Sequence, residues 1–93
     1  MKLPRAKASV VFKELSEGAL LFSTEEEVYL GLNDVGRRIW SLLPPACETL
    51  EELVAQLVRE YPDAPPDVIR SDVLELLEDL HRNQLLEHSP QLS

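Results

Sequence analysis

The fold is decided by residues 28–43, VYLGLNDVGRRIWSLL, because the spacing of the apolar side chains changes within this stretch. Up to Gly31 the apolar residues form a short run of strand character, and beyond it they recur at helical spacing. Asn33 lies where the period changes and is a good N-cap for a first helix. The stretch therefore predicts a strand that leads directly into a helix.

Two further runs of strand character precede this junction. They cover residues 9–15 and 18–22, with a turn signal between them and a polar break at residues 23–26. Short β-rich runs separated by a few turn residues are typical of an antiparallel meander. If the second loop is tight, five apolar side chains are expected on one face of the sheet: Leu20, Phe22, Val28, Leu30 and Leu32.

Two more helices are expected after Pro44-Pro45, which stops the first one. Thr49 and Glu52 form a capping box at the start of the second helix. Pro66 can occupy the first turn of the third helix, because a proline there loses no helical hydrogen bond. Asn33, Thr49 and Pro66 thus mark three helix starts, and the expected fold is α+β: a three-stranded antiparallel sheet followed by three helices, with winged helix-turn-helix topology.

The chain is expected to form a single domain over residues 1–93, since this length leaves no room for a second domain. The ordered core is expected over about residues 8–87. Residues 1–7 are predicted to be a polar arm and residues 88–93 a tail. The third helix is expected to end near Asn83 in a left-handed conformation, with Leu85 and Leu86 packing back on the domain.

The charge balance excludes several classes of partner. The chain has 9 basic and 17 acidic residues and a formal net charge of −8. Nucleic acids and anionic membranes attract Lys and Arg, so neither is an expected partner. Cys47 is the only cysteine, and no run approaches the ~20 apolar residues of a membrane span. These features favour a cytoplasmic protein without disulfides.

Catalytic and metal chemistry are not expected. His81 and His88 are the only histidines, and Cys47 is the only thiol. None of them belongs to a pattern that would bring a nucleophile and a base together. Two histidines without clustered carboxylates are a weak metal signal. The sequence therefore predicts no enzyme activity, no metal site and no cofactor.

A peptide-binding groove is one hypothesis that the pattern supports. The third strand is short and is expected at the edge of the sheet, where its unpaired backbone groups can bind another strand. A second stripe on the third helix contains Arg70, Leu74, Leu77 and His81. If that stripe borders the strand edge, the two form a groove. Plain core packing of Leu74 and Leu77 is the alternative.

The chain resembles the PqqD-like family over about residues 8–87. The resemblance is carried by VVFKELSEGALLF, VYLGLNDVGRRIWSLL, TLEELVAQL, DVLELLEDL and NQLL. Members of this family are recognition elements for ribosomally synthesised and post-translationally modified peptides (RiPPs), and they bind the leader region of the precursor. The sequence is most similar to the stand-alone recognition proteins of lasso peptide biosynthesis. Residues 23–26, STEE, stand where members from pyrroloquinoline quinone synthesis have a Tyr-Pro-Glu-Gly-like segment.

The resemblance implies a binding mode and a set of partners. The leader would add as a strand to the third strand and lie against the third helix. The implied contacts are the backbone around Val28, Tyr29 and Leu30 and the helix residues Arg70, Val73, Leu74 and Leu77. The implied partners are a precursor peptide, a leader peptidase and a cyclase. Two alternatives are a peptide chaperone of pyrroloquinoline quinone synthesis and a winged-helix DNA-binding regulator.

Overall fold

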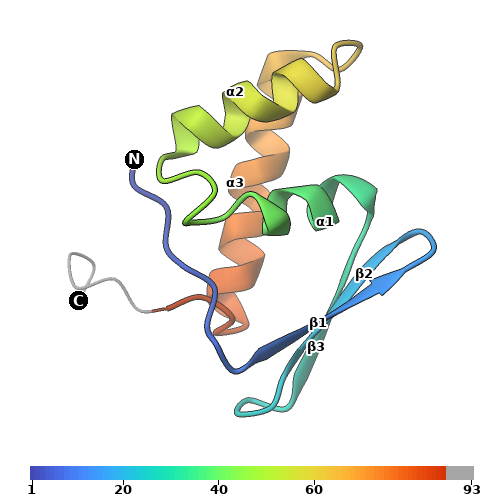
Figure 1. The fold of residues 1–93 in the computed structure, drawn as a ribbon, viewed down its shortest axis with the longest axis vertical. Helices are drawn as coiled ribbons and strands as arrows, with labels where there is room; N and C mark the ends of the chain where they lie inside the picture. Colours follow the sequence, from blue (N-terminus) through green and yellow to red (C-terminus); the bar gives the residue numbers. More distant parts are fainter. Residues whose placement is uncertain (88–93) are drawn as a thin grey trace.

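A computed structural model describes residues 1–87 and contains a three-stranded antiparallel sheet followed by three helices (Figure 1). The strands are β1 (Val10–Leu15), β2 (Gly18–Ser23) and β3 (Val28–Leu32), paired in the order β1-β2-β3. The helices are α1 (Asp34–Ser41), α2 (Leu50–Glu60) and α3 (Pro66–Arg82). This arrangement confirms the expected α+β fold and its winged helix-turn-helix order of elements.

The three helix starts are confirmed. The side chain of Asn33 accepts a hydrogen bond of 2.7 Å from the Gly36 N–H, which satisfies a backbone donor in the first turn of α1. The capping box of α2 is present in both directions: the Glu52 N–H donates to the Thr49 hydroxyl, and the Glu52 carboxylate accepts from the Thr49 N–H, each at 3.1 Å. Pro66 is the first residue of α3.

The end of α3 differs in detail from the expectation. Asn83 follows the helix, but its φ of −90° is not left-handed. The left-handed residue is Gln84, one position later, with a φ of 59°. Leu85 and Leu86 turn back and are both buried, as expected. The chain therefore needs one more residue than predicted before it reverses.

The expected distribution of side chains on the sheet was wrong by one residue. Leu21 pairs with Leu30, so these two share a face, whereas Phe22 pairs with Tyr29 on the other face. Because the side chains of a strand alternate, an offset of one residue moves all of them to the opposite face. The loop between β2 and β3 is not tight: it has four residues and contains Glu27 with a φ of 54°. The inward face therefore carries Ala19, Leu21, Ser23, Val28, Leu30 and Leu32.

The N-terminal segment is packed on the domain and is not a free polar arm. Leu3 is buried in the core, and its N–H donates to the Glu48 carbonyl at 2.9 Å. Further along, Lys7 donates to Leu85, and Glu87 donates to Arg5. Backbone hydrogen bonds and one buried leucine hold this segment, so the ordered region begins earlier than expected.

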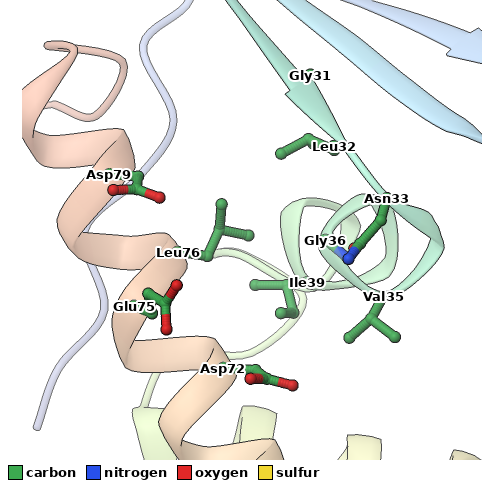
Figure 2. Close-up of a pocket in the computed structure, with 10 residues that line it drawn as sticks. All are labelled: Gly31, Leu32, Asn33, Val35, Gly36, Ile39, Asp72, Glu75, Leu76 and Asp79. Atoms are coloured by element: carbon green, nitrogen blue, oxygen red, sulfur yellow. The ribbon is translucent and has the colours of Figure 1, made fainter.

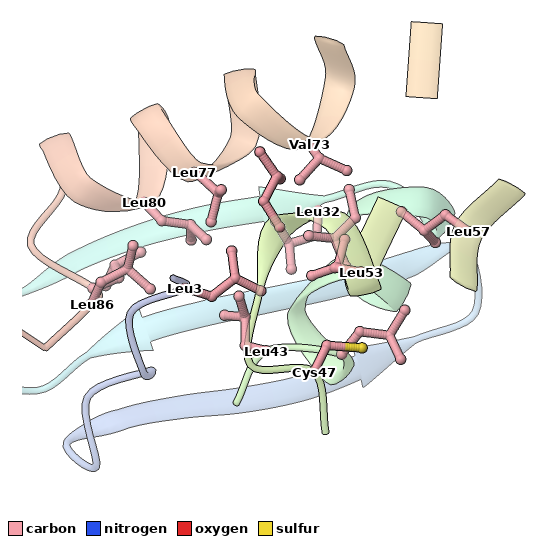
Figure 3. Packing of buried hydrophobic residues seen from close by; sticks show 14 of the residues in the cluster. Leu3, Leu32, Leu43, Cys47, Leu53, Leu57, Val73, Leu77, Leu80 and Leu86 are labelled. Carbon is pink, nitrogen blue, oxygen red and sulfur yellow. The ribbon is translucent and has the colours of Figure 1, made fainter. Parts of the chain in front are cut away.

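The core lies between the inward face of the sheet and the three helices. Val73, Leu77 and Leu80 project from α3 into it, together with Leu53 and Leu57 from α2 (Figure 3). None of the helices within residues 1–87 has the length and apolar character that crossing a membrane would require. Helix α3 packs on α2 and on α1, and its other side meets the end of β3 at the site described next.

Candidate functional site

Strand β3 forms one edge of the sheet. Only β2 pairs with it among the strands that the structure describes. In an antiparallel pair, the N–H and C=O groups of alternate residues point away from the partner strand, so the outer side of β3 offers groups that a further strand can bind. Tyr29 lies on the outward face, stacks on Phe22 with ring centroids 4.6 Å apart and is 66% exposed.

A pocket lies beside the C-terminal end of this strand. It has a volume of about 240 Å³ and is bounded by the end of β3, the first turns of α1 and one side of α3 (Figure 2). The lining residues are Gly31, Leu32, Asn33, Val35, Gly36, Ile39, Asp72, Glu75, Leu76 and Asp79. The pocket thus joins the strand edge to one side of α3.

The side of α3 that lines the pocket carries three carboxylates and one leucine. Asp72, Glu75, Leu76 and Asp79 follow the spacing i, i+3, i+4 and i+7, which places them on one helix face. Asp79 pairs with Arg82 at 3.1 Å. No salt bridge within residues 1–87 engages Asp72 or Glu75. The pocket wall is therefore acidic, and two of its carboxylates have no cationic partner in the described chain.

The predicted contact residues occupy three different environments. Val28 and Leu30 are half-buried on the inward face of β3, while Tyr29 is exposed on the outward face. Val73 and Leu77 belong to the core, at 0% and 7% exposure. The structure brings the three strand residues together at the edge. Their role in peptide binding stays a prediction.

The remaining predicted residues, Arg70 and Leu74, lie on α3 away from the pocket. Both are exposed, but the α3 residues that line the pocket start from Asp72. Successive helical residues are about 100° apart, so Arg70 and Leu74 fall on one flank of the core stripe and Asp72 on the other. The expectation that the stripe through Arg70, Leu74, Leu77 and His81 borders the strand edge is therefore corrected. Of the two leucines, Leu77 follows the core-packing alternative.

Sequence reasoning missed the acidic side of α3. Asp72, Glu75 and Asp79 were not among the predicted contact residues. Glu75 is exposed, whereas Asp79 is half-buried. One signal was available: Leu76 interrupts an acidic stripe at helical spacing. The helix has two flanks beside its core stripe, however, and the pattern alone does not tell which flank faces the sheet.

The strongest perturbation of a carboxyl pKa lies outside the pocket. The side-chain hydrogen bond from Arg38 and a second one from Gln56 lower the pKa of Glu60 to about 2. Arg38 Nε lies 2.7 Å from Glu60 Oε1, so the pair joins α1 to the end of α2. This network holds two helices together, and none of its three residues lines the pocket.

Cys47 lacks the environment of a reactive thiol. It is buried in the core, and burial raises the pKa of its thiol. A raised pKa opposes formation of the thiolate that a nucleophile or a metal ligand needs. His81 is exposed on α3, and His88 lies outside the described residues. No group of three or more potential metal ligands is present within residues 1–87.

Residues 18–86 and the fold of the chain both have known relatives. A family model for coenzyme PQQ synthesis protein D (PqqD) matches residues 18–86. The structure of TbiB1 in complex with the TbiA(beta) leader peptide aligns with a TM-score of 0.77 and 29% sequence identity, over 91% of this chain and 96% of that chain. No curated protein sequence matches.

A second solved structure agrees in fold. It is the solution NMR structure of the PqqD truncation of Methylobacterium extorquens PqqCD, a functional and stand-alone RiPP recognition element. It aligns with a TM-score of 0.73 and 24% identity, over 92% of this chain and 89% of that chain. Both solved structures therefore share the fold of this chain.

Proposed function

Because the chain belongs to the PqqD family and has the fold of a RiPP recognition element, we propose that it binds the leader region of a ribosomal precursor peptide. The observation that carries the proposal is the free edge of β3 with a pocket beside it. A leader strand paired to this edge would gain affinity from backbone hydrogen bonds and specificity from its alternate side chains. TbiB1, which was solved with a leader peptide, supports the same binding class.

The leader is proposed to lie along Val28, Tyr29 and Leu30 and then pass between β3 and α3. Val73 and Leu77 would support this side of the groove from the core, because they pack the helix in place. Arg70 and Leu74 were predicted to contact the leader directly. They lie on the other flank of α3 and do not line the pocket. Any contact that they make with the leader would therefore lie outside the pocket.

We assign the chain to lasso peptide biosynthesis on the sequence of its β2–β3 loop. Residues 23–26 lack the Tyr-Pro-Glu-Gly-like segment of the quinone-synthesis members. In this assignment the domain acts in the cytoplasm and presents the bound precursor to a leader peptidase and a cyclase. Its own contribution is binding and presentation, not bond cleavage.

The charge of α3 does not support a DNA-binding role, in which this helix would enter the major groove of DNA. In helix-turn-helix proteins the recognition helix places side chains against the bases and is surrounded by contacts to phosphates. The exposed surface of α3 carries Asp72, Glu75 and Glu78, which would repel phosphates. A mobility-shift assay at low salt should therefore show no sequence-dependent retardation.

The proposed function is tested by fluorescence polarisation with a labelled leader from the precursor encoded beside this chain's gene. Saturable binding is expected, and a scrambled leader should bind far more weakly. Two leaders that carry N-methyl groups on alternating sets of backbone amides test the strand addition. N-methylation of the set that faces β3 removes the donors and should abolish binding, while the other set should be tolerated. Equal affinity of both methylated leaders would rule out strand addition.

A further inference from the structure

The pocket beside β3 has an unbalanced charge. Three carboxylates, from Asp72, Glu75 and Asp79, line it from α3 (Figure 2), and no basic side chain is among the lining residues. Arg82 pairs with Asp79 and with Glu78, and no salt bridge among residues 1–87 engages Asp72 or Glu75. The net charge of the chain, −8, adds to the negative potential at this site. The pocket should therefore attract a cation and reject an acidic side chain.

The opposite wall of the pocket carries the apolar side chains of Leu32, Val35 and Ile39 beside the polar Asn33. Leu32 and Ile39 are buried at its base, and Leu76 projects between the carboxylates of α3 (Figure 2). A volume of about 240 Å³ lies below the roughly 300 Å³ at which small-molecule sites begin. A space of this size suits one long side chain. Lys and Arg combine an apolar stem with a cationic end, so they match both walls.

The pocket lies on the inward face of the sheet, so only inward-facing side chains of an added strand can reach it. Leu32 lies on the inward face of β3 and lines the pocket. Residues directly opposite each other on paired strands share a face, so the leader residue beside Leu32 would point into the pocket. The acidic row from Asp72 to Asp79 spans about 10 Å of helix. Inward-facing residues of a strand are about 7 Å apart, so the row can face two of them.

We propose that the pocket is a specificity site for a Lys or Arg side chain of the leader, at the inward-facing position beside Leu32. The inference rests on the proposed function, because it requires the leader to pair with β3. The ammonium or guanidinium group contacts Asp72 and Glu75, and its methylene stem lies on Leu76 and Leu32. A second basic residue two positions along the leader would face Asp79.

The cation at this site is a side chain and not a metal ion. No cluster of three or more metal-binding groups occurs in the described part of the chain. Asp72 and Glu75 are exposed, which suits a long flexible cation that remains partly hydrated. Ion pairs of this kind are screened by salt, so the proposed contact predicts a binding affinity that falls as ionic strength rises.

The test measures the affinity of the labelled leader for a double variant, Asp72→Asn/Glu75→Gln, by fluorescence polarisation. Both substitutions keep the shape of the side chains and remove their charge. One exposed ion pair contributes about two- to fivefold in affinity, so the double variant should bind about tenfold more weakly at low salt. The difference should shrink to within about twofold at 1 M NaCl, where the screening length is about 3 Å.

The matched control is Asp63→Asn/Asp67→Asn, which removes the same charge from exposed positions outside the pocket. It should bind like the unmodified protein. A second leader, with its basic residues replaced by Gln, should bind weakly and should not distinguish the pocket variant from the unmodified protein. If the basic side chains contact Asp72 and Glu75 directly, removing either partner should make removal of the other have no further effect on affinity.

Three results would overturn the inference. One is equal affinity of the pocket variant and the unmodified protein for the leader at low salt. Another is a pocket effect that persists when the leader has no Lys or Arg. A leader that does not bind the unmodified protein at all would refute the proposed function together with the inference, so the two failures can be told apart.

Discussion

Gly18→Ala should destabilise the protein far more than Gly31→Ala, although both glycines lie in strands. Gly18 has a φ of +125°, a conformation that side chains rarely adopt, and a Cβ placed there would lie 2.0 Å from the carbonyl oxygen of Leu32. A residue held in such a conformation costs of order 1–3 kcal/mol. The clash adds to this cost, because backbone must shift to relieve it. We expect a total loss of at least about 3 kcal/mol.

The measurement is thermal unfolding followed by circular dichroism. For a domain of this size, 1 kcal/mol shifts the Tm by roughly 4–8 °C, so Gly18→Ala should lower the Tm by at least roughly 12 °C. Gly31 is the matched control, since a Cβ there meets nothing within 4 Å. Gly31→Ala should change stability by less than about 1 kcal/mol. Similar Tm values for the two variants would refute the argument that the turn after β1 is packed against the end of β3.

Three further predictions concern the helices. Asn33→Ala removes the cap of α1 and should cost about 1 kcal/mol of unfolding free energy, measured by urea titration. Leu77→Ala should cost about 2–5 kcal/mol because Leu77 is in the core, whereas Leu74→Ala, at 39% exposure, should cost less than about 1 kcal/mol; equal losses would contradict the described orientation of α3. The pKa of Glu60 is about 2 in the folded protein, below its ordinary value of 4.5, so the stability it provides is present above pH 4.5 and is lost as the pH falls towards 2. Glu60→Gln, which weakens the pair with Arg38, should therefore destabilise at pH 7 and have little effect near pH 2, and a difference that is constant across this range would be inconsistent with the ion pair.

The helices were predictable because their starts have local chemical signatures. Thr49 with Glu52, and Asn33 with the Gly36 N–H, are interactions over three residues that the sequence displays directly. The strands were also located correctly within a residue or two. The face of the sheet to which each β2 side chain points was predicted wrongly, because it depends on the length of the loop between β2 and β3. Glu27 adopts a positive φ there, and nothing in the run of three glutamates indicates it.

The site was only partly predictable for a related reason. The edge position of β3 followed from the order of the elements, and this expectation was confirmed. The flank of α3 that faces β3 depends on how the helix packs, which is a tertiary property. The stripe with Leu74 and Leu77 is more apolar than the opposite flank and was therefore predicted to face β3. In the structure Leu77 lies in the core, and Glu75 and Leu76 line the pocket.

The packed N-terminal segment has a consequence for how the molecule folds. The pairing of Ala6 with Leu86 closes nearly the whole described chain into one loop. Closing a loop costs entropy that grows with its length, although slowly. These contacts also need β1 and α3 in place before they can form. We therefore expect them to form last during folding and to open first in the native state, so that the Lys7 and Glu87 amides exchange with solvent faster than those in the middle of α2.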